Sequence, residues 1–170
     1  MEMLTEKLLQ ELREYVELNA DHHKHIAYSI SSSAGKLYLP DIQETELEDY
    51  INSKRQPIFN QVLFNLIDTK KITDADVYRR AGIDRRLFSK IRSKPQYRPG
   101  KNTVIALALA LELNKEATDQ LLSAAGYSLS DNETYDLVIQ FCLEKKIFNI
   151  EDVNQALVYF SLKPLGGALD

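Results

Sequence analysis

The chain has 170 residues, of which 44% are hydrophobic and 27% are charged, with a net charge of -4, so its composition is that of an ordinary globular protein. Its one cysteine, Cys142, excludes an internal disulfide, and no hydrophobic run approaches the roughly 18 residues that a membrane span requires. The glutamates among the first 20 residues also argue against a signal peptide, so we expect a soluble, cytoplasmic protein without membrane contact.

The first 55 residues predict an acidic helical arm with a net charge of -5. An amphipathic helix is expected over 3–19, because apolar residues recur there at helical spacing: Leu4, Leu8, Leu12, Tyr15 and Val16. Residues 20–37 are rich in small polar residues and are expected to be a flexible linker. A short helix near 43–53 follows, with Leu47, Tyr50 and Ile51 on one face.

Residues 56–170 predict a second, larger helical domain, and no period-two strand pattern interrupts it. Prolines and glycines fall between the expected helices, which we place at 57–70, 74–81, 85–93, 101–113, 115–125, 131–145 and 150–160. The helix at 101–113 is apolar on all sides and should be the central buried helix. The last two helices are expected to pack on the one before them and to close the core. The fold class is therefore all-α.

Cap residues support several of these boundaries. Thr73 and Asp76 have the spacing of a capping box, and Asp84 is placed to cap the following helix. Ser130 with Glu133 and Asn149 with Asp152 have the same kind of spacing before the last two helices.

One segment within this acidic protein is strongly basic. Residues 71–101 contain ten Lys and Arg against three Asp, a net charge of +7. A phosphate backbone responds to such a local field rather than to the total charge. Nucleic acid is therefore a plausible partner, with a merely solvated charged face as the alternative.

The two short helices expected at 74–81 and 85–93 are joined by a turn at Gly82. Phe88 and Ile91, three residues apart, should face the core. With these two residues inward, the opposite side of the helix contains Arg85, Arg86, Ser89 and Lys90. A helix of this width can enter a major groove.

These residues carry a family resemblance. Gly82 at the turn, Ile83 after it, the run from Phe88 to Ile91 and the basic loop with two prolines resemble the lambda-repressor-like helix-turn-helix domain of the Xre/Cro type. The order and lengths of the five helices over 57–125 also agree with that domain. More narrowly, residues 57–164 resemble a bacterial helix-turn-helix module that is appended to varied partner domains, macrodomains among them.

The resemblance implies a five-helix core with two added C-terminal helices, and it implies a transcription regulator that binds double-stranded DNA as a homodimer. Its recognition helix would be 85–93, with base contacts from Arg85, Arg86, Ser89 and Lys90. Phosphate contacts would come from the loop and the start of the next helix, through Lys94, Tyr97, Arg98, Lys101, Asn102 and Thr103. Arg79 and Arg80 are expected to be solvated.

One position departs from the family pattern. Where the family commonly has alanine, this chain has Tyr78, which should push the two short helices apart unless Ala81 replaces the contact. The alternative function is a helix-turn-helix fold used as a protein-interaction module, or an antitoxin-like adaptor that binds a protein through residues 1–55. The arm itself has three candidate surfaces: a second copy, a partner protein or its own domain. Because the arm is acidic, it could also fold over the basic segment 71–101 and compete with DNA.

Other chemistry has little support. His22, His23 and His25 lie close together, but without a shaped scaffold they are expected to be a solvated loop rather than a metal site. Cys142 lies among apolar residues and should be in the core. No local pattern of catalytic residues or of a phosphate-binding loop is present, so neither an enzyme nor a cofactor is expected.

Overall fold

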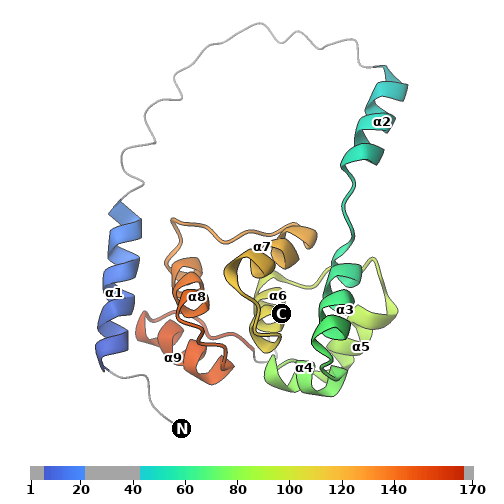
Figure 1. Cartoon of the computed structure of the whole chain (residues 1–170). Helices are drawn as coiled ribbons and strands as arrows, with labels where there is room; N and C mark the ends of the chain where they lie inside the picture. Colours follow the sequence, from blue (N-terminus) through green and yellow to red (C-terminus); the bar gives the residue numbers. More distant parts are fainter. Residues whose placement is uncertain (1–5, 22–42, 167–170) are drawn as a thin grey trace, which may run out of the picture.

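The computed structural model describes residues 6–21 and 43–166, apart from the side chains of residues 20 and 21, and all regular structure in these two ranges is helical. Figure 1 shows the helices in chain order: α1 (Glu6–Asp21), α2 (Glu44–Lys54), α3 (Phe59–Lys70), α4 (Asp74–Arg80), α5 (Arg85–Ser93), α6 (Lys101–Ala110), α7 (Lys115–Ala124), α8 (Thr134–Glu144) and α9 (Ile150–Tyr159). The all-α prediction is confirmed. Within the same ranges, no helix is long and apolar enough to span a membrane.

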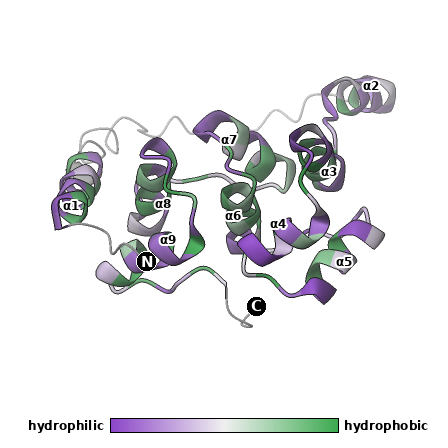
Figure 2. Ribbon diagram, turned by 60° about the horizontal axis from the view of Figure 1, so that its bottom comes forward, coloured by the Kyte–Doolittle hydropathy of each residue, from purple (hydrophilic) through white to green (hydrophobic). Residues whose placement is uncertain are grey.

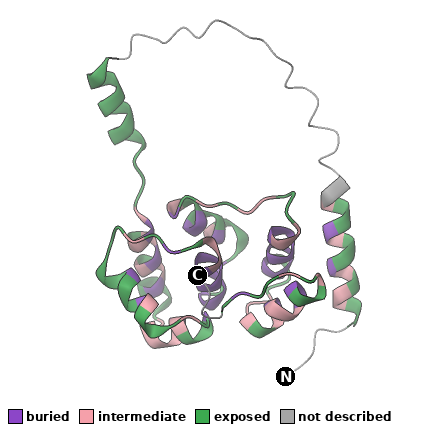
Figure 3. Cartoon of the chain, turned by 180° about the vertical axis from the view of Figure 1, so that it is seen from behind, coloured by how far each residue is buried: buried purple, intermediate pink, exposed green. Residues whose placement is uncertain are grey.

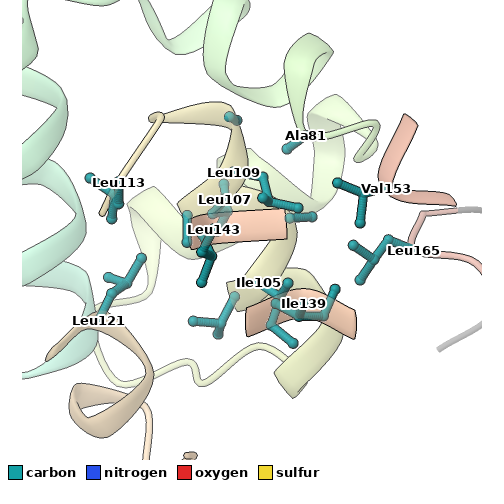
Figure 4. Close-up of a cluster of buried hydrophobic side chains, with 14 of the residues drawn as sticks. Ala81, Ile105, Leu107, Leu109, Leu113, Leu121, Ile139, Leu143, Val153 and Leu165 are labelled. Atoms are coloured by element: carbon teal, nitrogen blue, oxygen red, sulfur yellow. The ribbon is translucent and has the colours of Figure 1, made fainter. Parts of the chain in front are cut away.

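The centre of the fold is α6, as its sequence predicts. Every residue of this helix from Thr103 to Ala110 is buried, because α4, α7 and α9 pack around it. Figure 4 shows Ile105, Leu107 and Leu109 of this helix among leucine, isoleucine and valine side chains from other parts of the chain. A helix without a polar face is stable only when it is covered on all sides.

A second fully covered helix is α8, in which every residue from Asp136 to Leu143 is buried. Its neighbours are α7, α9 and, most extensively, α1. Figure 2 shows the hydrophobic residues concentrated on α6 and α8, between helices with more polar outer faces. Cys142 lies in this core, as predicted, and its burial raises the pKa of the thiol to about 12.

The C-terminal helices close the core, as expected, and α8 contacts α7. The packing of α9 differs from the expectation, because its main contacts are with α8 and α6. Asn154 of α9 also binds both the N–H and the C=O of Leu165, at 2.7 and 2.9 Å, and fixes the segment after the helix against the body. The extension therefore completes the core around α6, with α8 in contact with α7.

Most predicted caps are present. The side chains of Thr73, Asp84, Asn114 and Asn149 accept hydrogen bonds from backbone N–H groups at the starts of α4, α5, α7 and α9. The capping box predicted at Ser130 and Glu133 is wrong, because α8 starts only at Thr134 and its N-cap has no side-chain hydrogen bond.

The N-terminal segment, predicted as one arm, divides into two helices with different surroundings. Leu12 and Val16 of α1 are buried against the body, whereas α2 has no buried residue. Figure 3 shows a buried stripe along α1 and a fully exposed α2 that projects from the start of α3. The arm was considered to pack against a second copy, a partner protein or the body of its own chain. For α1 the third option holds, because it packs on α8. Leu4, the linker and the three histidines lie outside the described residues.

Candidate nucleic-acid interface

The helix α5 has two chemically distinct faces. Phe88 and Ile91 are 3% and 0% exposed, so the predicted inward face is confirmed. The other face is open to solvent and contains the four predicted base-contact residues, Arg85, Arg86, Ser89 and Lys90. The short helix thus presents three cations and a hydroxyl on one side.

The inward face fixes α5 on α3. Asn60 donates a hydrogen bond from Nδ2 to the backbone oxygen of Ile91 at 2.6 Å. The rings of Phe64 and Phe88 meet edge to face, with centroids 6.0 Å apart. The guanidinium of Arg92 lies 3.9 Å from the Phe64 centroid and also binds Asp74 at 2.6 Å. These contacts come from α3 and α4 and set the direction in which the exposed face points.

The turn before α5 is tight and covered from behind. Gly82 has φ +63°, a left-handed conformation that a side chain would strain. A Cβ on Gly82 would lie 3.6 Å from Ile150 of α9, and one on Gly166 would lie 3.4 Å from the Gly82 carbonyl oxygen. The C-terminal extension therefore supports the back of the turn and leaves the outer face of α5 open.

Tyr78, at the position that departs from the family pattern, lies against α5. Its ring lies half-buried beside Phe88, with centroids 5.9 Å apart, and forms part of the packing between α4 and α5. Ala81 is fully buried at the junction. The Tyr78 ring is therefore part of the core contact between the two helices.

The first turn of α5 contains the cations with the fewest constraints. Asp84 accepts a hydrogen bond from the backbone N–H of Arg86 at 2.5 Å, so this carboxylate is used as the helix cap. Within residues 6–21 and 43–166, the side chains of Arg85, Arg86 and Lys94 have no ion pair or ring contact. They can accept an anionic partner without breaking an existing contact.

The loop between α5 and α6 is organised by aromatic rings. The ammonium of Lys90 lies 4.1 Å from the centroid of the Tyr97 ring, and the guanidinium of Arg98 lies 5.6 Å from that of Tyr127. Tyr127 in turn donates a hydrogen bond to the Pro99 oxygen at 3.1 Å. Tyr97 therefore orients a cation of the interface and is itself half-buried.

The start of α6 contains three of the predicted phosphate contacts. Lys101 binds Asp136 of α8 at 2.6 Å, and its side chain is only 31% exposed. Asp136 is buried and also accepts a hydrogen bond from the Ser130 N–H at 2.7 Å. The Thr103 side chain is buried as well, whereas Asn102 is half-exposed. Lys101 therefore joins α6 to α8 through Asp136. The phosphate contacts expected from Lys101, Asn102 and Thr103 stay a prediction.

Arg79 and Arg80 are exposed, as predicted. Arg80 lies 3.7 Å from Glu112, and both arginines line a small hollow of about 430 Å³ with Phe148 and Glu151. A larger groove of about 910 Å³ lies between α3 and α7 and has mixed charge at its rim. In the described part of the chain, no group of His, Cys, Asp and Glu is arranged to hold a metal ion.

The chain matches no protein-family model, no curated protein and no solved structure.

Proposed function

We propose that α3 to α7 form a helix-turn-helix domain of the lambda-repressor-like kind, that α5 is its recognition helix, and that the protein is a DNA-binding transcription regulator. The observation that carries the proposal is the division of α5 into a buried apolar face and an open cationic face. A helix of this width fits the major groove, where its first turn meets base edges.

The roles divide by position. Arg85 and Arg86 are in the first turn of α5, and arginine can form two hydrogen bonds with one guanine. Ser89 and Lys90, one turn later, contact a base or a phosphate. Lys94 and Arg98 contact the backbone, with Tyr97 as the support of Lys90.

The decisive variant is the double substitution Arg85→Ala with Arg86→Ala. Loss of two base contacts at about 1–3 kcal/mol each should weaken specific binding about 30-fold or more. The matched control is Arg79→Ala with Arg80→Ala, which removes the same charge from an adjacent arginine pair on α4. The measurement is fluorescence anisotropy with genomic fragments that flank the protein's own gene, and circular dichroism should show unchanged helicity in both variants.

Equal losses in the two double variants would mean that binding follows net charge alone and would remove α5 from its role. Failure of the unaltered chain to bind any duplex at low salt would overturn DNA binding and favour the protein-interaction alternative.

Lys94→Ala tests the backbone contacts. Because Lys94 is exposed and unpaired within the described ranges, its loss should weaken specific and nonspecific binding alike and lower the slope of log K against log salt by about one. An unchanged slope in Lys101→Ala would remove Lys101, which is paired with Asp136, from the predicted phosphate contacts.

A further inference from the structure

Half of the exposed large apolar side chains in the described ranges belong to one short helix. Leu47, Tyr50 and Ile51 of α2 are 47%, 61% and 45% exposed. The helix has 11 residues and none of them is buried. A single helix of this length is marginal in water unless something covers its apolar face.

The exposed face of α2 has a pattern that is symmetric about its centre. Glu44, Leu47, Ile51 and Lys54 follow one another at spacings of three, four and three, so they lie along one side of the helix. The two apolar residues are each two positions from Asp49, and the two charged residues are each five positions from it. Reversal of the helix therefore superposes leucine on isoleucine and glutamate on lysine.

We propose that two copies of the chain pair through α2 in antiparallel orientation. Leu47 then packs against Ile51 of the partner subunit, and Glu44 lies opposite Lys54 of the partner subunit at each end. Tyr50 covers the side of this contact. A parallel pair is disfavoured because it sets Glu44 against the partner's Glu44 and Lys54 against the partner's Lys54.

The connection to α3 favours a second copy over the chain's own body. Arg55 and Ile58, on either side of Gln56 and Pro57, have extended backbones with ψ of 122° and 158°. The N–H of Ile58 is held by the Gln61 side chain at 3.4 Å, and Pro57 restricts its own φ. In Figure 1 the helix accordingly projects from the top of α3 and does not fold onto it.

The size of the contact sets its strength. Two 11-residue helices bury less than the roughly 1,200 Å² typical of stable interfaces, so the dimer should be reversible and dependent on concentration. Such a pair brings two copies of α5 into one particle, but its formation does not depend on DNA binding.

Sedimentation of the full chain over a concentration series tests the pairing. The unaltered chain should convert from monomer to dimer as its concentration rises, and Leu47→Ser with Ile51→Ser should remain monomeric. The matched control is Leu18→Ser with Val158→Ser, which removes two exposed apolar side chains from α1 and α9 and should still dimerise. None of the four residues is buried, so both variants should keep the fold of the body, and the monomeric variant should lose at most the helicity of α2. A chain that stays monomeric throughout, or equal losses in both variants, overturns the proposal.

Disulfide trapping tests the orientation, with Cys142 buried and unreactive in the background. In an antiparallel pair, Glu44→Cys and Lys54→Cys chains cross-link when they are mixed. Neither cross-links with itself, because equivalent positions are about 15 Å apart along the helix axis, beyond the roughly 7 Å limit for a disulfide. Cross-links in each variant alone would show a parallel pair, and the absence of any cross-link would show that α2 does not pair with itself. No DNA is present in either experiment, so these outcomes are independent of the function proposed for α5.

Discussion

The two N-terminal helices have similar amphipathic sequences but opposite surroundings. Leu12 of α1 is 1% exposed against α8, whereas Leu47 of α2 is 47% exposed. The difference lies in the available partner surface. α8 is apolar around most of its circumference, and α7 and α9 leave one side of it for α1 to cover. An apolar stripe thus shows that a helix has a face to bury, while its partner is determined by another part of the chain.

Polar contacts at the edge of the interface between α1 and α8 fix the position of α1 along α8. Tyr15 donates a hydrogen bond to Glu144 at 3.1 Å, and its ring meets Phe141 edge to face at 5.5 Å. Lys145 binds Glu11 at 2.7 Å. No contact of this kind joins α2 to another described helix. Matched substitutions in α1 and α2 should therefore have different effects on stability.

The largest expected difference is between Leu12→Ala and Leu47→Ala. The first leaves a cavity under α1 and should lower the free energy of unfolding by about 2–5 kcal/mol. The second removes an exposed side chain and should change it by no more than about 0.5 kcal/mol. Urea unfolding at low protein concentration, where α2 pairing is absent, measures both. Equal effects would mean that α1 is not part of the folded core.

Tyr15→Phe should have a smaller, pH-dependent effect. Burial, together with the hydrogen bond to Glu144 and its charge, raises the pKa of Tyr15 to about 12, above the value of about 10 in an unfolded chain. The neutral phenol therefore contributes stability below pH 10, and this contribution is lost as the pH rises toward 12.

Urea unfolding at pH 8, 10 and 12 checks this prediction. The variant should be less stable than the unaltered chain by about 0.5–1 kcal/mol at pH 8, and the gap should close with rising pH. Burial also raises the pKa of Tyr135 to about 12, but that residue is common to both proteins and cancels in the difference. A gap that stays constant to pH 12 would contradict the role of the phenol.

The sequence predicted those features whose causes are local. The apolar run of α6 marked it as the central helix, and Thr73, Asp84 and Asn149 marked helix starts through short-range hydrogen bonds. The predicted start of α8 was wrong because the N–H of Ser130 binds the side chain of Asp136. Asp136 is held in turn by Lys101, which is 35 residues away in the chain. A capping pattern does not reveal such a competing long-range contact.

In the candidate interface, too, the features with local causes were predicted and those that depend on long-range contacts were not. The spacing of Phe88 and Ile91 was sufficient to orient α5 and expose its four polar residues. The pairing of Lys101 depends on a buried carboxylate of another helix, and no neighbouring residue encodes it. For α1, the signal was present but remote: a helix as uniformly apolar as α8 requires cover on every side.

The smallest expected effect comes from the ion pair at the edge of α1. The hydrogen bond and charge of Lys145 lower the pKa of Glu11 below its ordinary value of 4.5. The ionised carboxylate therefore contributes stability above the pKa of the unfolded chain, and this contribution is lost as the pH falls below it. Because both side chains are partly exposed, salt should also screen the attraction.

Glu11→Gln should accordingly lower the melting temperature slightly at pH 7 and low salt, by less than Tyr15→Phe does. The difference from the unaltered chain should shrink in high salt, and again as the pH falls below 4.5 toward the lowered pKa of the carboxyl group. Glu46→Gln is the matched control, because Glu46 is an exposed glutamate of α2 with no ion pair in the described ranges, and it should leave the melting temperature unchanged. If both substitutions lowered the melting temperature equally, the effect would follow from total charge, and the ion pair would have no part in holding α1 against α8.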